Sequence, residues 1–242
     1  MVRLATQSVI RLPSIRFFRA AQWACITLLA CLQLGCSINA DRYNRLGKEA
    51  FDEGQMTEAI NQFQTALSAD PNNSDAYYNL ASSYYTLGKR TNNPQALAQA
   101  EELYRQAIAL NDMNEDAHRG LACLLVDTNR KQEAFNSLKG WQARHPTSVD
   151  PLIELARLNQ EFGNSRQAAD LLTDAILLDN QNVRALTAMG YVRASQGQYA
   201  QAIQNYNRVL QLDGNQTQVT QQINELQLRM AQNSQNQKTS SY

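Results

Sequence analysis

Few side chains in this sequence are of the kinds that do chemistry. The chain of 242 residues holds two histidines, His118 and His145, and four cysteines, of which Cys123 stands far from the other three. A catalytic nucleophile or a zinc site needs several such residues together with an orienting carboxylate. The sequence identifies no such carboxylate for either histidine, and it has no glycine-rich phosphate loop and no Ser-His-Asp arrangement. It therefore predicts a non-enzymatic protein with no cofactor, no metal site and no small-molecule substrate.

The elements that would position these residues follow a repeat. Alanines stand at Ala59, Ala100, Ala134, Ala168 and Ala202, at intervals of 41, 34, 34 and 34 residues, with apolar residues at helical spacing around them. A period of 34 resembles the tetratricopeptide repeat, a helix pair that buries its faces by stacking on the next pair. The resemblance implies an all-α fold, a right-handed superhelical solenoid, with five repeats at 40–73, 74–114, 115–148, 149–182 and 183–216.

Turns and ends of the helices can be placed from the same pattern. The second repeat holds seven extra residues, and its Asn93-Pro94 pair is typical of a helix start, so a helix is expected over Pro94–Leu110. Segment 217–231 keeps an apolar stripe and is expected to be a capping helix, whereas the polar tail 232–242 is expected to be disordered. The turn inside each repeat needs a left-handed backbone, which glycine and then asparagine tolerate. The residues expected at these turns are Gly54, Gly88, Asn129, Gly163 and Gly197.

The first 35 residues are predicted to be a signal peptide that is removed. They hold four arginines and no acid, and an apolar run over 23–34 that is too short to span a bilayer. The run leads into a glycine followed by Cys36, which resembles the lipobox of bacterial lipoproteins, although Gln33 stands where that family usually has leucine. An ordinary cleaved export signal and an uncleaved N-terminal anchor remain as alternatives. The segment predicts an exported protein that is anchored in the bacterial cell envelope through a lipidated Cys36, and Ser37 in place of an aspartate favours the outer membrane.

The charge distribution disfavours nucleic acid as a partner. The chain has 22 basic and 22 acidic residues, and the first 35 residues hold four of the basic ones, which leaves 18 against 22 in the remainder. A mildly acidic body without a basic stripe lacks the electrostatic footprint of a nucleic-acid-binding protein.

In the tetratricopeptide family, residues at fixed places of each first helix line a concave groove that holds a protein or peptide, and the resemblance carries these places to this chain. Aromatic residues among them would supply rigid contact area. Three basic and three acidic groove residues balance, so charge selects no ligand, and aspartates such as Asp116 and Asp150 are interpreted as helix N-caps instead. The groove residues expected to bind the partner are Asn44, Lys48, Phe51, Tyr78, Ser82, Tyr85, Arg119, Cys123, Arg157 and Tyr191.

Four further residues can be interpreted from their positions. His118 stands where the other repeats have Tyr or Leu, so a packed core imidazole is favoured over a catalytic base, and His145 lies at a helix C-terminus, where a partly cationic ring suits the helix dipole. Trp141 stands at an alanine position, and its ring would overpack that site by roughly 1–3 kcal/mol unless Gly140 yields space. Cys123 is expected to be a small buried apolar residue on the groove floor.

These features together predict a non-catalytic scaffold, membrane-anchored in the envelope, that binds a protein or peptide partner in its groove and assists assembly of an envelope complex. Two alternatives remain: an accessory subunit of an enzyme, and a soluble exported assembly factor without a lipid anchor.

Overall fold

A computed structural model describes residues 39–239, so the predicted signal peptide and Cys36 lie outside the described residues. All regular secondary structure within that range is α-helical, which confirms the predicted fold class. None of the described helices has both the length and the apolar character that crossing a bilayer requires. The helices are 39–52, α2 (Met56–Ala69), α3 (Ser74–Thr91), α4 (Pro94–Leu110), α5 (Glu115–Asp127), α6 (Lys131–Arg144), α7 (Asp150–Glu161), α8 (Ser165–Leu178), α9 (Val183–Ser195), α10 (Tyr199–Leu212) and α11 (Thr217–Thr239).

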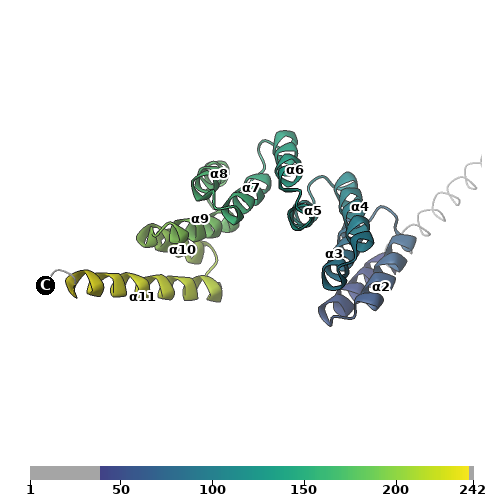
Figure 1. Cartoon of the computed structure of the whole chain (residues 1–242), viewed down its shortest axis with the longest axis horizontal. Coiled ribbons are helices and arrows are strands. Elements are labelled where there is room, and N and C mark those ends of the chain that lie inside the picture. Colours follow the sequence, from purple (N-terminus) through teal and green to yellow (C-terminus); the bar gives the residue numbers. More distant parts are fainter. Residues whose placement is uncertain (1–38, 240–242) are drawn as a thin grey trace, which may run out of the picture.

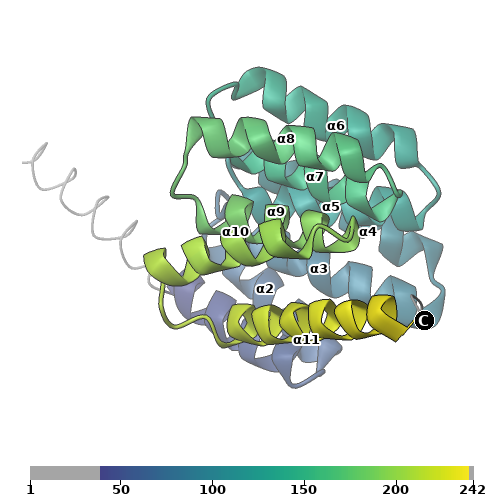
Figure 2. The same ribbon diagram turned by 90° about the vertical axis from the view of Figure 1, so that its left-hand side faces the viewer.

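Consecutive helices pack as pairs, and the pairs follow one another in a curved stack with α2 near one end and α11 at the other (Figure 1). Viewed from the α11 end, the helices lie roughly along one direction, one pair behind the next (Figure 2). The first helices of successive pairs also touch, because α3 contacts α5, α5 contacts α7 and α7 contacts α9. These helices therefore form one continuous face of the stack.

The turns inside the pairs confirm the glycine pattern at all positions except one. Gly88 is part of α3, which runs on to Thr91, and the left-handed residue of this repeat is Asn92, with φ of 49°. The extra residues of the second repeat therefore lengthen its first helix before Asn93 caps α4 at the predicted start, Pro94. The expected left-handed turn residues with positive φ are Gly54 at 76°, Asn129 at 64°, Gly163 at 77° and Gly197 at 75°.

The core is built on the small residues that set the repeat. Since alanine has a single methyl group, two helices approach closely wherever it lies between them. A glycine makes room for a bulky side chain of the neighbouring helix: a Cβ on Gly190 would lie 2.4 Å from Cε1 of Tyr206. All five alanines of the repeat, Ala59, Ala100, Ala134, Ala168 and Ala202, are fully buried.

Trp141 is accommodated in a different way from the one the sequence suggests. Its ring is fully buried and stacks on His118, with ring centroids 4.1 Å apart and planes inclined by 8°. Gly140 does not supply the space, because a Cβ there would meet only the tip of Arg144 at 3.4 Å. A flat imidazole beneath the indole replaces the bulkier Tyr or Leu of the other repeats, so the two substitutions compensate for each other.

The C-terminal helix is longer than predicted. α11 buries Val219, Ile223 and Leu226 against α10, as expected of a helix that covers the end of the stack. It continues to Thr239, and the expected disorder of 232–242 is therefore wrong for 232–239. Once a helix is nucleated, adding residues costs little, and the glutamines of this segment are good helix formers.

Candidate partner-binding groove

The continuous face formed by the first helices carries two neighbouring hollows. The first, of about 470 Å³, lies over the helix 39–52, α3 and α5, and the second, of about 820 Å³, lies mainly between α7 and α9. Arg119 borders both. Asn44 borders neither but accepts a hydrogen bond from Asn79 at 2.9 Å. Of the predicted groove residues, Lys48, Phe51, Tyr78, Ser82, Tyr85, Arg119 and Cys123 line the first hollow, and Arg119, Arg157 and Tyr191 line the second.

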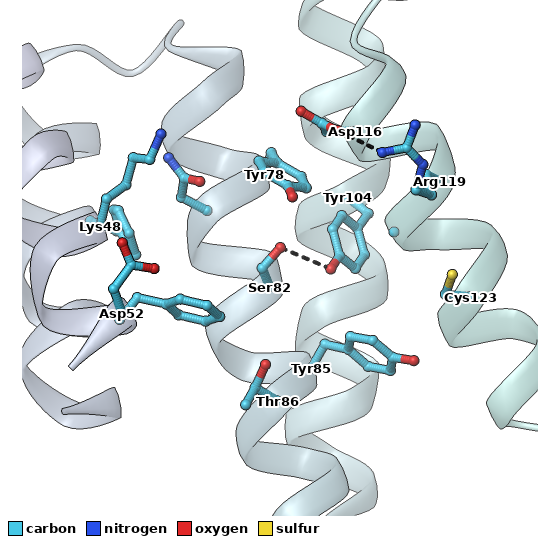
Figure 3. Close-up of a pocket in the computed structure, with 14 residues that line it drawn as sticks. Lys48, Asp52, Tyr78, Ser82, Tyr85, Thr86, Tyr104, Asp116, Arg119 and Cys123 are labelled. Atoms are coloured by element: carbon cyan, nitrogen blue, oxygen red, sulfur yellow. Dashed lines mark hydrogen bonds and ion pairs between the residues drawn. The ribbon is translucent and has the colours of Figure 1, made fainter. Parts of the chain in front are cut away.

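The first hollow is walled by aromatic rings (Figure 3). Tyr78 lies 6.1 Å from Tyr104 between ring centroids, and the Tyr104 hydroxyl lies 3.1 Å from that of Ser82. Tyr104 belongs to α4, a second helix, and so was missing from the predicted set. It reaches the hollow because Gly120 has no side chain: a Cβ there would lie 2.5 Å from Cε1 of Tyr104. A glycine within a first helix is the sequence feature that could have predicted that this ring reaches the hollow.

Tyr85 joins the second repeat to the third. Its hydroxyl donates to Oδ2 of Asp127 at 2.5 Å, and Nζ of Lys89 lies 2.5 Å from the same oxygen. Burial opposes ionisation of Asp127, but the hydrogen bonds from Lys89 and Tyr85 outweigh it and hold the pKa of this carboxyl below its usual range. The Tyr85 hydroxyl is therefore engaged within the chain, and what it offers to a ligand is the face of its ring.

A buried carboxylate, Glu154, organises the space between the hollows. It is 1% exposed and accepts from Nε and Nη2 of Arg119 at 2.9 and 2.8 Å and from Nε of Arg157 at 2.9 Å. Burial raises the pKa of Glu154, but the two guanidinium groups outweigh burial and hold that pKa below the usual value. Sequence reasoning missed this residue because its role depends on an arginine 35 positions away.

The aspartates interpreted as N-caps have another role. The first turns of α3, α5 and α9 are capped by asparagine side chains, such as Asn114, which accepts from Ala117 N–H. Asp116 instead pairs with Arg119 at 3.2 Å, and Asp150 pairs with Arg184 at 3.0 Å. The N-cap interpretation is therefore wrong, and the groove arginines are largely neutralised by acids of the groove itself.

The second hollow has an apolar floor with a polar edge. Residues one helical turn apart on α7 and α9 face it, since Ile153 and Arg157 recur at the spacing of one helix face, as do Thr187 and Tyr191. Tyr191 is 60% exposed, which is high for an aromatic ring beside a hollow. The floor residues are Ile153, Leu172, Val183, Ala188 and Val192.

Cys123 lines the first hollow, whereas both histidines lie beside Asp112. Cys123 is half-buried on the wall of the first hollow, and burial raises the pKa of its thiol, so the thiol stays protonated. The sequence identified no carboxylate for the histidines, but Nε2 of His145 lies 2.7 Å from Oδ2 of Asp112 and Nε2 of His118 lies 3.6 Å from Oδ1. Arg144 donates to both oxygens of Asp112 and holds its pKa well below the usual range. The cluster ties the turn before α5 to the end of α6, and within residues 39–239 no group of His, Cys, Asp and Glu could hold a metal ion.

Comparison with known proteins agrees with this geometry. The TPR repeat pattern matches 47–88, and the tetratricopeptide repeat pattern matches 95–149 and 153–217. DnaJ homolog subfamily C member 3 of Gallus gallus is 27% identical over 210 residues, which are 79% of this chain and 40% of that protein. Its Homo sapiens counterpart is 39% identical over 56 residues, which are 22% of this chain and 11% of the human protein. The chain thus spans less than half the length of these relatives.

Solved structures share the fold at low identity. A thermophilic TPR protein of Thermus thermophilus is 18% identical with a TM-score of 0.60, and the match covers 78% of this chain and 99% of that one. The pilF protein of Pseudomonas aeruginosa is 21% identical with a TM-score of 0.55, covering 86% of this chain and 89% of the other. Paired helices, small residues at a fixed period and the matched repeat patterns make this chain a member of the tetratricopeptide repeat family, whose typically non-catalytic domains bind protein or peptide partners.

Proposed function

We propose that this protein is an exported lipoprotein, held in the bacterial cell envelope through Cys36, that binds a protein or peptide partner in its concave groove and so assists assembly of an envelope complex. The observation that carries the binding role is the alignment of the predicted groove residues. Nine of the ten, contributed by all five helix pairs, border the two hollows described above. The outer membrane is the proposed location.

The lipid anchor would fix the position of the groove. A single acyl chain holds a protein only marginally, whereas the two or three chains of a bacterial lipoprotein hold it stably, at ~0.8 kcal/mol per buried methylene. The described part of the chain starts at residue 39, within its first helix and three residues after Cys36. Three residues span at most about 10 Å, so this end of the helix array would lie close to the membrane surface.

The anchor is tested by the intact mass of the mature protein isolated from its native host. A diacyl or triacyl adduct on Cys36 that is absent from the Cys36→Ala variant is the expected result. An unmodified N-terminus in the wild type would contradict the anchor and leave the binding role standing.

The groove is tested by site-specific photo-crosslinking in the same host. A photoreactive phenylalanine analogue placed at Tyr191, which borders the second hollow, is expected to give a discrete light-dependent adduct with a second protein. The control position is Leu177 on α8, which is 78% exposed and borders neither hollow. Adducts at Leu177 as abundant as those at Tyr191 would contradict binding in the groove.

A further inference from the structure

Exposed apolar side chains gather where the second helices of the pairs end. Within residues 39–239, eight large apolar side chains are exposed, and three of them are Tyr191 beside the second hollow and Leu228 and Met230 on α11. The other five lie in the last turn of a second helix or in the loop that follows it. These five are named the apolar edge residues: Leu110 on α4, Met113 after it, Leu177 and Leu178 on α8, and Leu212 on α10.

The apolar edge residues lie on the side of the array at which the described chain starts. Because the two helices of a pair run in opposite directions, each second helix ends on the side where its first helix begins. In Figure 2 the connections from α8 to α9 and from α10 to α11 lie on the left, and the described chain also starts there. The turns inside the pairs, such as that at Gly163, form the opposite edge, and among the described residues these turns expose no large apolar side chain.

The proposed lipid anchor is attached at the same edge. Cys36 precedes residue 39 by three residues, which span at most about 10 Å. Arg166 and Leu177 are both exposed at opposite ends of α8, eleven residues or roughly 17 Å apart along the helix axis. A membrane that holds Cys36 is therefore nearer to the apolar edge residues than to the turns inside the pairs.

The distribution of the apolar edge residues fits a lipid surface. They come from the second, fourth and fifth helix pairs, so they offer separate contacts along the edge instead of one patch. A stable protein interface needs a contiguous core of matching shape. The boundary between lipid headgroups and acyl chains is fluid, and it accepts separate apolar side chains to a depth of about 5–10 Å. Leu177, which is 78% exposed, is the most accessible of the five.

Charge at this edge favours a zwitterionic lipid surface over an anionic one. Asp179 and Asp213 directly follow α8 and α10, and Oδ1 of each accepts a backbone N–H two residues later, at 3.0 and 3.3 Å. Arg144 and Arg184, at the same edge, are paired with acids of the chain at 2.7 and 3.0 Å. An anionic headgroup would therefore meet acidic side chains and arginines that are already engaged, whereas a zwitterionic headgroup carries no net charge.

We propose that the apolar edge residues lie on a zwitterionic membrane surface and insert their side chains among the lipids. This inference rests on the proposed lipid anchor and specifies how the anchored array is oriented. The helices run from one edge to the other, so they stand upright on the membrane. The groove is lined by the sides of the first helices and therefore opens along the membrane surface, where a partner in the same membrane can enter it.

The test is photo-crosslinking to lipid in the full chain, isolated from its native host and reconstituted into phosphatidylcholine vesicles. The photoreactive phenylalanine analogue is placed at Leu177 or, as the matched control, at Arg166 at the other end of α8. After illumination, intact mass should show a chain carrying one additional phospholipid. This adduct should be at least about fivefold more abundant at position 177, because roughly 17 Å of helix separates the two positions.

A second pair of variants separates insertion from mere closeness to the anchor. Leu178→Ser combined with Leu212→Ser should lower the lipid adduct at position 177 about threefold or more, because two partly exposed leucines lose their transfer out of water. Leu228→Ser on α11, which is 65% exposed and lies away from this edge, should leave the adduct unchanged. Replacing part of the phosphatidylcholine with anionic phosphatidylglycerol should not increase it.

Three results would overturn the inference. They are lipid adducts at Arg166 as abundant as at Leu177, an adduct at Leu177 that is insensitive to the two serine substitutions, and an adduct that increases with anionic lipid.

Failure of the anchor gives a different result from failure of the inference. If the mass of the chain shows an unmodified Cys36, the proposed anchor is contradicted. The inference would still hold if that chain gave the lipid adduct at Leu177 on added vesicles, and it would fall with the anchor if no adduct formed. A lipidated Cys36 without an adduct at Leu177 would contradict the inference alone.

Discussion

Replacing the buried carboxylate of Glu154 by an amide should destabilise the protein more than any other charge removal in the groove. Glu154→Gln keeps the shape of the side chain and one acceptor but removes the negative charge. The two guanidinium groups that donate to it, Arg119 and Arg157, then lose their buried carboxylate partner, as does Arg184, whose Nη2 lies 3.4 Å away. The variant therefore leaves these guanidinium groups with only their more exposed acidic partners, Glu115, Asp116, Asp150 and Glu161.

The size of the effect follows from burial. Removing one partner of a buried ion pair costs about 3–5 kcal/mol. The three arginine side chains are 35% to 41% exposed, so water reaches them and compensates part of that loss. We expect Glu154→Gln to lower the free energy of unfolding by roughly 2–3 kcal/mol, which for a chain of this size corresponds to about 5–10 °C in Tm.

Urea unfolding followed by circular dichroism measures this difference, and Glu161→Gln is the matched control. Glu161 lies on the same helix and also pairs with Arg157, at 3.3 Å, but is 46% exposed, so its loss should cost less than about 0.5 kcal/mol. Because the folded pKa of Glu154 lies below its unfolded value, its contribution is present above pH of about 4.3 and is lost as the pH falls through the folded pKa. Equal effects of the two substitutions at pH 7 would refute the argument from burial.

Three further predictions concern the core. Burial lowers the pKa of His118 below its ordinary value of about 6.5. As the pH drops below that value the unfolded chain is protonated before the folded one, so the free energy of unfolding should fall. In His118→Leu this part of the pH dependence should vanish in unfolding titrations between pH 7.5 and 5.5. Ala168→Glu places a charge at a fully buried position and should cost more than about 3 kcal/mol, seen as loss of the fourth repeat in the melting curve. Gly190→Ala should destabilise by about 1 kcal/mol net, since a clash with Tyr206 exceeds the gain in helix propensity, whereas Gly140→Ala should stabilise by a similar amount.

Each of these has an outcome that contradicts it. A pH profile that is the same with and without His118 would show that its proton is not linked to folding. An unchanged melting curve for Ala168→Glu would be incompatible with the repeat register. If Gly190→Ala and Gly140→Ala changed the free energy of unfolding in the same direction, the close approach of Tyr206 would not be what disfavours a side chain at position 190.

Most of the fold could be predicted from the repeat period, because the features that define each repeat are local. A left-handed turn residue, an N-cap and a buried alanine are each fixed by a few neighbouring positions, so Asn129 and the start of α4 at Pro94 could be read from the chain. The prediction of a left-handed turn at Gly88 was wrong for the same reason. The extra residues after it offered the helix a continuation, and the local pattern did not indicate that the turn would move to Asn92.

The sequence predicted which first-helix residues line the two hollows, but not the contacts that these residues make. Its lining follows from the position of each residue on a first helix, which the period supplies. Glu154 and Asp112 act through partners about one repeat away, and Tyr104 enters from a second helix through the gap at Gly120. Such contacts depend on how one pair is rotated against the next, and that rotation is set by side-chain packing across the whole interface rather than by any short stretch of sequence.

The bond between Arg184 on α9 and Glu115 on α5 has a mechanical consequence. A stacked array deforms as a series of elastic units, because each repeat contacts only its neighbours. This contact joins residues 69 positions apart and passes over the intervening repeat, while the same guanidinium also holds Asp150 on α7 at 3.0 Å. Stretching the array along its axis would therefore have to break ionic contacts as well as bend packed helices. Because salt screens these partly exposed charges, the last three repeats should be stiff at low ionic strength and more extensible at high ionic strength.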